Sequence, residues 1–133
     1  MYSWRLRNID NRPWSLSNEI EELRGFDIGV MPMPDNEWTK GKCGFKLLQY
    51  MACGLSVVAS PVGVNLEIVD EDKNGYFAIT KDDWVSKLSI LIENDELRHK
   101  MGLNGREKII NKYSLNNTKI IFYGTLIKVY KER

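Results

Sequence analysis

The sequence is poor in residues that hold metals or form disulfides. Its 133 residues include only two cysteines and one histidine. Neither Cys43 nor Cys53 has a second cysteine or a histidine nearby at the spacing of a zinc site. We therefore expect no metal and no cofactor, and a reducing cytoplasm as the compartment.

Long apolar runs and an excess of one charge are also lacking. No window holds the roughly 18 consecutive apolar residues of a membrane-spanning helix, and the first residues lack the apolar stretch of a signal peptide. The 19 basic residues are nearly balanced by 18 acidic ones, so the protein has no overall positive electrostatic field that would attract nucleic acid. We expect a soluble protein with one core, too short for two full domains.

Apolar runs bounded by glycines predict an α/β fold. Residues 26–31 and 55–59 have the pattern of parallel strands covered on both faces, and a helix between Gly44 and Gly54 joins them into a βαβ unit. Alternation predicts a further strand at residues 2–6, and a last strand is expected at residues 76–79. The expected architecture is a partial three-layer, Rossmann-like parallel sheet of about four strands with helices on both faces.

Further helices are expected on either side of these strands. Ser15 or Ser17 is expected to cap a short helix that ends at Gly25, with acidic residues suited to its first turn. Asn65 is expected to cap another short helix. Residues 33–43 read as a long polar loop.

The C-terminal part reads as helical. Asn74 and Gly75 predict a turn, and three helices are expected after residue 80. Residues 1–79 thus form the β/α part, and residues 80–133 form a helical C-terminal part.

Two loops after buried strands form the candidate binding region, because ligands bind at the carboxyl ends of the strands in open α/β sheets. After the first loop, the N–H groups of Gly44, Phe45 and Lys46 begin a helix whose dipole favours an anion. Lys46 adds a positive charge, and the amide of Gln49 lies on the same side, where it suits a hydroxyl group. The pattern predicts a nucleotide-sugar site, although composition alone favours a solvated helix face for both side chains.

Several other residues have simpler interpretations. Both cysteines are expected to pack as small apolar residues, and His99 to be exposed. Trp38 either stacks on a base or sugar or anchors its loop. The remaining tryptophans are expected in the core or at helix caps: Trp4, Trp14 and Trp84.

Three segments resemble the donor-binding domain of the retaining group 1 glycosyltransferases of the GT-B fold. They are residues 26–32, 41–54 and 57–69, and the likeness extends over nearly the whole chain. The resemblance implies that residues 1–133 are a truncated C-terminal donor-binding domain that binds a nucleotide-diphosphate sugar. The whole enzyme would then transfer the sugar to a saccharide or lipid-linked acceptor with retention and without a metal.

The resemblance also assigns individual residues, although it identifies no catalytic group. Gly44, Phe45 and Lys46 correspond to the diphosphate-binding helix start. Gln49 stands where the family has the second of two glutamates, which holds the ribose, and the first would fall at Gly41. An amide bonds a diol without the strength of a carboxylate. The donor loops would be formed by Lys42, Cys43, Ser60, Val62, Gly63 and Asn65.

By this resemblance, the two leading β-α units and the acceptor domain are missing. In the strand order 3-2-1-4-5-6, residues 2–6 would be strand 3, and the strand at residues 26–31 would lose its neighbour. An uncovered strand favours association. We therefore expect a fragment, inactive alone, that forms a homodimer or exchanges its N-terminal segment. The resemblance also allows a peripheral location of the full-length enzyme at the inner face of the membrane.

An alternative from another class is a non-catalytic α/β phosphate-binding or interaction module that works with a separate subunit carrying the missing half. A regulatory domain of flavodoxin type would also fit the anion-binding loop. The sequence, however, lacks the acidic cluster or the flavin-stacking loops expected of such a domain.

Overall fold

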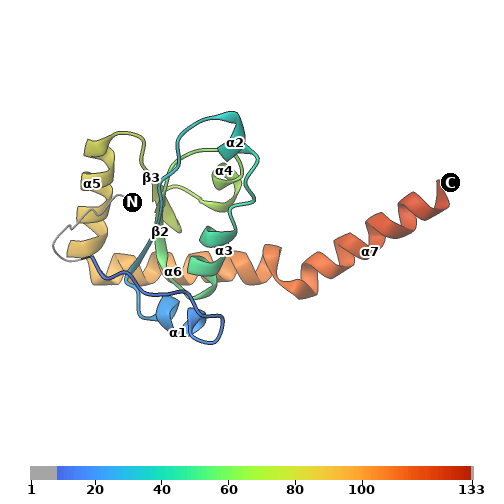
Figure 1. Cartoon of the computed structure of the whole chain (residues 1–133), viewed down its shortest axis with the longest axis horizontal. Helices are drawn as coiled ribbons and strands as arrows, with labels where there is room; N and C mark the ends of the chain where they lie inside the picture. The colour runs from blue at the N-terminus through green and yellow to red at the C-terminus, as the bar shows by residue number, and fades with distance from the viewer. Residues whose placement is uncertain (1–8, 133) are drawn as a thin grey trace.

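Three parallel strands lie between layers of helices in the computed structural model, which describes residues 9–132 (Figure 1). The strands are β1 (Ile28–Met31), β2 (Ser56–Ala59) and β3 (Gly75–Phe77), paired in chain order. The α/β class and the parallel pairing are confirmed. The strand expected at residues 2–6 lies outside the described residues, and three strands form the sheet within them.

The helices follow the strands closely along the chain. Their bounds are α1 (Glu19–Arg24), α2 (Glu37–Lys40), α3 (Phe45–Ala52), α4 (Asn65–Ile68), α5 (Lys81–Glu93), α6 (Asp95–Lys108), a π-helical segment η1 (Ile109–Tyr113) and α7 (Leu115–Lys131).

β2 is the centre of the sheet, and all four of its residues are buried. Because side chains alternate along a strand, Val57 and Ala59 enter one apolar cluster and Val58 enters the other. This double burial explains why the β2 sequence is apolar without polar alternation.

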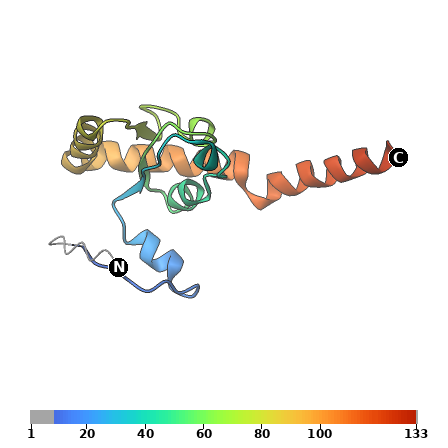
Figure 2. The same cartoon turned by 45° about the horizontal axis from the view of Figure 1, so that its top comes forward.

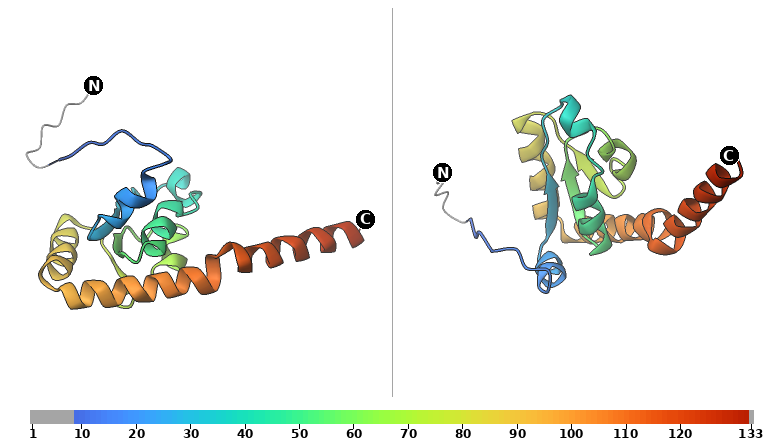
Figure 3. Two further views of the ribbon diagram at one scale, coloured as in Figure 1. Left: turned by 90° about the horizontal axis from the view of Figure 1, so that it is seen from below. Right: turned by 45° about the vertical axis from the view of Figure 1, so that its right-hand side comes forward.

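Helices cover both faces of the sheet (Figure 3). On the face of Val57, α3 contributes the fully buried Leu47 and Met51, and α4 contributes Ile68. On the opposite face, α5 and α6 supply buried residues to the second cluster. The three-layer arrangement expected from the sequence is therefore confirmed.

Helix α6 approaches the end of α3 with no side chain between the two backbones. A Cβ atom on Gly102 would overlap the carbonyl oxygen of Gly54. One turn further along α6, a Cβ atom on Gly105 would meet the side chain of Met51 at 3.1 Å. Small residues thus allow α6 to lie directly against the βαβ unit.

The last helix, α7, extends away from the rest of the molecule after the break at Ser114 (Figure 2). None of its described residues is buried, and Ile120, Phe122 and Tyr130 are each about two thirds or more exposed. Among residues 9–132, no helix combines the length and apolar character that crossing a membrane requires.

Two expected helix caps are wrong. Helix α1 begins after Asn18, whose side chain makes no capping bond, while the hydroxyl groups of Ser15 and Ser17 bond each other at 2.8 Å. Asn65 is the first residue of α4 instead of its cap, because its side chain turns inward and donates to the carbonyl of Ser60.

The long polar loop and the turn before β3 also differ from expectation. Residues 37–40 form α2, which is held by a capping box between Asn36 and Thr39. Before β3, the residue with positive φ is Asp72. Gly75 instead begins β3, where a Cβ atom would lie 2.5 Å from the carbonyl oxygen of Val57.

Candidate functional site

A cavity of about 600 Å³ lies beside the carboxyl end of β1. Strand β1, the loop before α3, α3 itself and α1 all contribute to its wall. The lining residues are Glu19, Met31, Gly41, Lys42, Cys43, Gly44, Phe45, Lys46 and Gln49. The structure therefore brings together the predicted helix start, Lys46, Gln49 and the first of the two predicted loops.

Gly44 sets the start of α3. Its φ is +66°, a conformation that glycine adopts readily, and a Cβ atom there would lie 2.5 Å from Cδ1 of Ile68 in α4. The first N–H groups of a helix have no acceptor within it. In α3 those of Phe45 and Lys46 belong to residues that line the cavity.

Glu19 joins the two predicted side chains of α3. Its Oε1 accepts a hydrogen bond from Nε2 of Gln49 at 3.0 Å and lies 3.6 Å from Nζ of Lys46. The hydrogen bond from Gln49 is the main cause that lowers the pKa of Glu19, with further contributions from Trp14 and the charge of Lys46. Glu19 is therefore an ionised, acceptor-only group at neutral pH.

The sequence did not predict Glu19 as a site residue. It precedes Gln49 by 30 positions, and an acidic residue in the first turn of a helix is explained by the helix dipole alone. The available signal was the lack of a carboxylate at Gly41 and Gln49, which left the predicted ribose site without an anionic acceptor.

The second predicted loop lies elsewhere. Ser60, Val62 and Asn65 are at most 7% exposed and do not line the cavity. Ser60 accepts a hydrogen bond from the N–H of Met33 at 2.9 Å. Gly63, with φ of +55°, lies so close to the loop before α3 that a Cβ atom would be 2.7 Å from the carbonyl oxygen of Lys40. In this structure, the second loop packs against the first loop and does not line the cavity.

The other single residues divide between the interpretations. His99 is exposed and Trp84 packs against the core, as expected. Trp14 is 71% exposed and lies before Asn18, the N-cap of α1, so its expected place in the core or at a helix cap is wrong. Trp38 is 80% exposed and does not anchor its loop, and Cys43 is exposed instead of packed.

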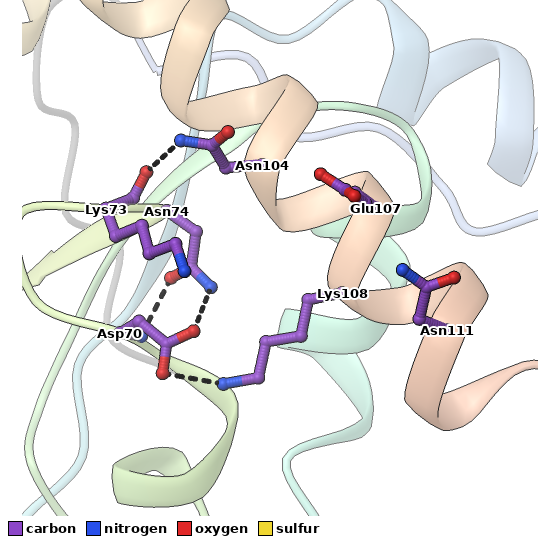
Figure 4. Close-up of a pocket in the computed structure, with 7 residues that line it drawn as sticks. All are labelled: Asp70, Lys73, Asn74, Asn104, Glu107, Lys108 and Asn111. Carbon is purple, nitrogen blue, oxygen red and sulfur yellow. Dashed lines mark hydrogen bonds and ion pairs between the residues drawn. The ribbon is translucent and has the colours of Figure 1, made fainter.

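A second pocket, of about 400 Å³, lies between α6 and the turn before β3 (Figure 4). Several of its polar groups already bond one another. Nζ of Lys108 lies 2.9 Å from Oδ1 of Asp70, and Nδ2 of Asn104 donates to the carbonyl of Lys73 at 2.8 Å. These contacts therefore link α6 to the turn before β3. Within the described part of the chain, no group of three or more His, Cys, Asp or Glu side chains is placed to hold a metal ion.

Comparison with known proteins gives one family. A model described as "Glycosyl transferases group 1" matches residues 14–108. The structure is similar to the C-terminal domain of a group 1 family glycosyl transferase, LpcC, from Francisella tularensis, with a TM-score of 0.67 and 30% identity. The similarity covers 79% of this chain and 53% of that one. The comparison with curated proteins found no match.

Two larger proteins share the fold. Sucrose-phosphate synthase from Thermosynechococcus elongatus has a TM-score of 0.62, and HepE from Anabaena, solved in complex with UDP, has one of 0.60. Each is 17% identical and is matched over 79% of this chain. The chain spans 26% of the first and 29% of the second.

Proposed function

Because the chain belongs to the group 1 glycosyl transferases, we propose that it is the donor-binding part of such an enzyme and holds a nucleotide-diphosphate sugar in the cavity beside β1. The observation that carries this proposal is the meeting of the α3 start, Lys46 and Gln49 in one cavity at the carboxyl edge of the sheet. The UDP in the Anabaena protein of the same fold supports it.

The diphosphate would lie at the start of α3. There the N–H groups of Gly44, Phe45 and Lys46, the helix dipole and the Lys46 ammonium stabilise negative charge. As the bond to the sugar breaks, that charge grows on the leaving diphosphate, so the same groups favour transfer. Gln49 would bond the ribose. The sugar would pass, with retention and without a metal, to a saccharide or lipid-linked acceptor.

We assign the acceptor site to another part of the enzyme, because the chain spans only about half of the Francisella domain and less than a third of the two larger proteins. On this proposal, residues 1–133 are a truncated donor-binding domain, with Lys42 and Cys43 in the donor loop. Ser60, Val62, Gly63 and Asn65 support that loop from behind. The enzyme would work in the cytoplasm, with the full-length form at the inner face of the membrane.

Titration calorimetry with UDP and GDP tests the binding site. We expect weak binding of at least one nucleotide and its loss in Lys46→Ala. The matched control is Lys128→Ala, since Lys128 is an exposed lysine of α7 outside the cavity. Equal binding by Lys46→Ala and the unchanged protein would overturn the assignment.

The second candidate is a non-catalytic module that works with a separate subunit. It is favoured by the edge position of β1, which pairs on one side with β2 and, among the described residues, has no strand on its other side. Dimer formation or exchange of the N-terminal segment at this edge is the corresponding proposal for the chain alone. Activity that appears only on mixing with a co-purifying partner supports the subunit, and a strict monomer in light scattering excludes the dimer.

A further inference from the structure

We propose that Glu19 is a ligand-binding residue of the cavity beside β1: its carboxylate accepts hydrogen bonds from the ribose hydroxyl groups and makes the cavity prefer a nucleotide to free pyrophosphate. This inference rests on the proposed function and adds a residue that lies within the family match but outside residues 26–32, 41–54 and 57–69.

The geometry places the carboxylate where a ligand would meet it. Glu19 lines the cavity together with the apolar side chains of Met31 and Phe45, and its own side chain is only 20% exposed. Both the Gln49 and the Lys46 contacts are made by Oε1. Since a carboxylate has about four acceptor positions, acceptor capacity remains for hydroxyl donors.

Gln49 and Glu19 work as a pair. The Gln49 amide uses its Nε2 to hold Glu19, so one of its two N–H donors is already engaged. A hydroxyl group bound to a carboxylate makes a charge-assisted hydrogen bond, which is about twice as strong as a neutral one. Glu19 thus provides the anionic acceptor that the amide of Gln49 cannot provide.

The charge of Glu19 also affects bare anions. Two lysines, Lys42 and Lys46, line the cavity, and Glu19 lies within ion-pair distance of the second. Its negative charge offsets part of the attraction for phosphate groups. Pyrophosphate is repelled by the charge of Glu19 and has no ribose hydroxyl group to bond with it. A nucleoside diphosphate is repelled too, but its ribose hydroxyl groups donate hydrogen bonds to the same carboxylate. Removing the charge should therefore shift the two affinities in opposite directions.

The test is calorimetric titration of Glu19→Gln, which keeps the shape of the side chain. The probes are whichever of UDP and GDP binds more tightly, its 2′-deoxy analogue, and pyrophosphate. We expect the nucleotide to bind about tenfold more weakly, the preference for ribose over deoxyribose to disappear, and pyrophosphate to bind about two- to fivefold more tightly.

Two further variants keep the result interpretable. Glu21→Gln removes a charge from the same helix at a residue that pairs with Arg24 outside the cavity, and it should change none of the three affinities. Glu19→Asp keeps the charge but withdraws the acceptor, so the ribose preference should fall while pyrophosphate binding stays weak. Thermal melting checks that each variant is folded.

The outcomes separate the two proposals. If Glu19→Gln keeps the ribose preference and binds pyrophosphate as before, while Lys46→Ala still abolishes nucleotide binding, the role of Glu19 is overturned and the proposed function stands. If no nucleotide binds to the unchanged protein, both are overturned.

Discussion

The glycines of α6 and α7 allow one prediction to be worked out in magnitude. Gly102 and Gly124 both lie inside helices, where replacement of glycine by alanine usually stabilises by about 1 kcal/mol. At Gly102 the new methyl group would overlap the carbonyl oxygen of Gly54, a backbone atom that cannot rotate away. At Gly124 it meets nothing within 4 Å.

We expect Gly102→Ala to lower the free energy of unfolding by about 2 kcal/mol, because overpacking of about 3 kcal/mol outweighs the gain in helix propensity. For a chain of this size, that loss lowers Tm by roughly 8 °C. Gly105→Ala should be nearly neutral, since the flexible Met51 side chain can shift.

Gly124→Ala is the matched control. It should increase the helix content of α7 with little change in the main transition, because no described residue of α7 is buried. Circular dichroism at 222 nm, followed during heating, measures both quantities. A Gly102→Ala protein that melts at or above the temperature of the unchanged protein would refute the close approach of α6 to α3.

Three further predictions concern the supporting loops and a helix cap. Gly63→Ala should lower the free energy of unfolding by about 2 kcal/mol or more, measured by urea titration, because it combines positive φ with contact against Lys40. Asn65→Ala should cost about 1–3 kcal/mol by the same assay through the lost bond to Ser60. Backbone N–H groups of Thr80 and Ile79 lower the pKa of Asp83, so its stabilisation is complete above about pH 4 and is lost as the pH falls; acid titration of Asp83→Asn should show a flatter loss.

The βαβ unit was predictable because its signals are local. Unbroken apolar runs mark β1 and β2, and the helix between them begins directly after Gly44 and ends two residues before Gly54. Those signals also located the cavity, since the carboxyl end of β1 and the start of α3 follow from the topology alone.

The features that were missed depend on polar contacts or on distance along the chain. Helix α2 is four residues long and is specified by the Asn36–Thr39 capping box, without an apolar period. Asn65 is fully buried although asparagine is usually exposed, because one amide bond to Ser60 turns it inward. Glu19 is 30 positions from Gln49 in the sequence, so its place in the cavity wall follows only from the folded structure.

The chain order of the strands has a consequence for how the molecule is made. Every residue that lines the cavity lies between Glu19 and Gln49, and β2 pairs with β1 directly after them. These two parallel strands are consecutive in sequence, so a single helical crossover joins them. The whole wall of the cavity is therefore encoded in the first half of the chain, and residues from the second half stabilise it from outside, where Gly102 of α6 lies against Gly54.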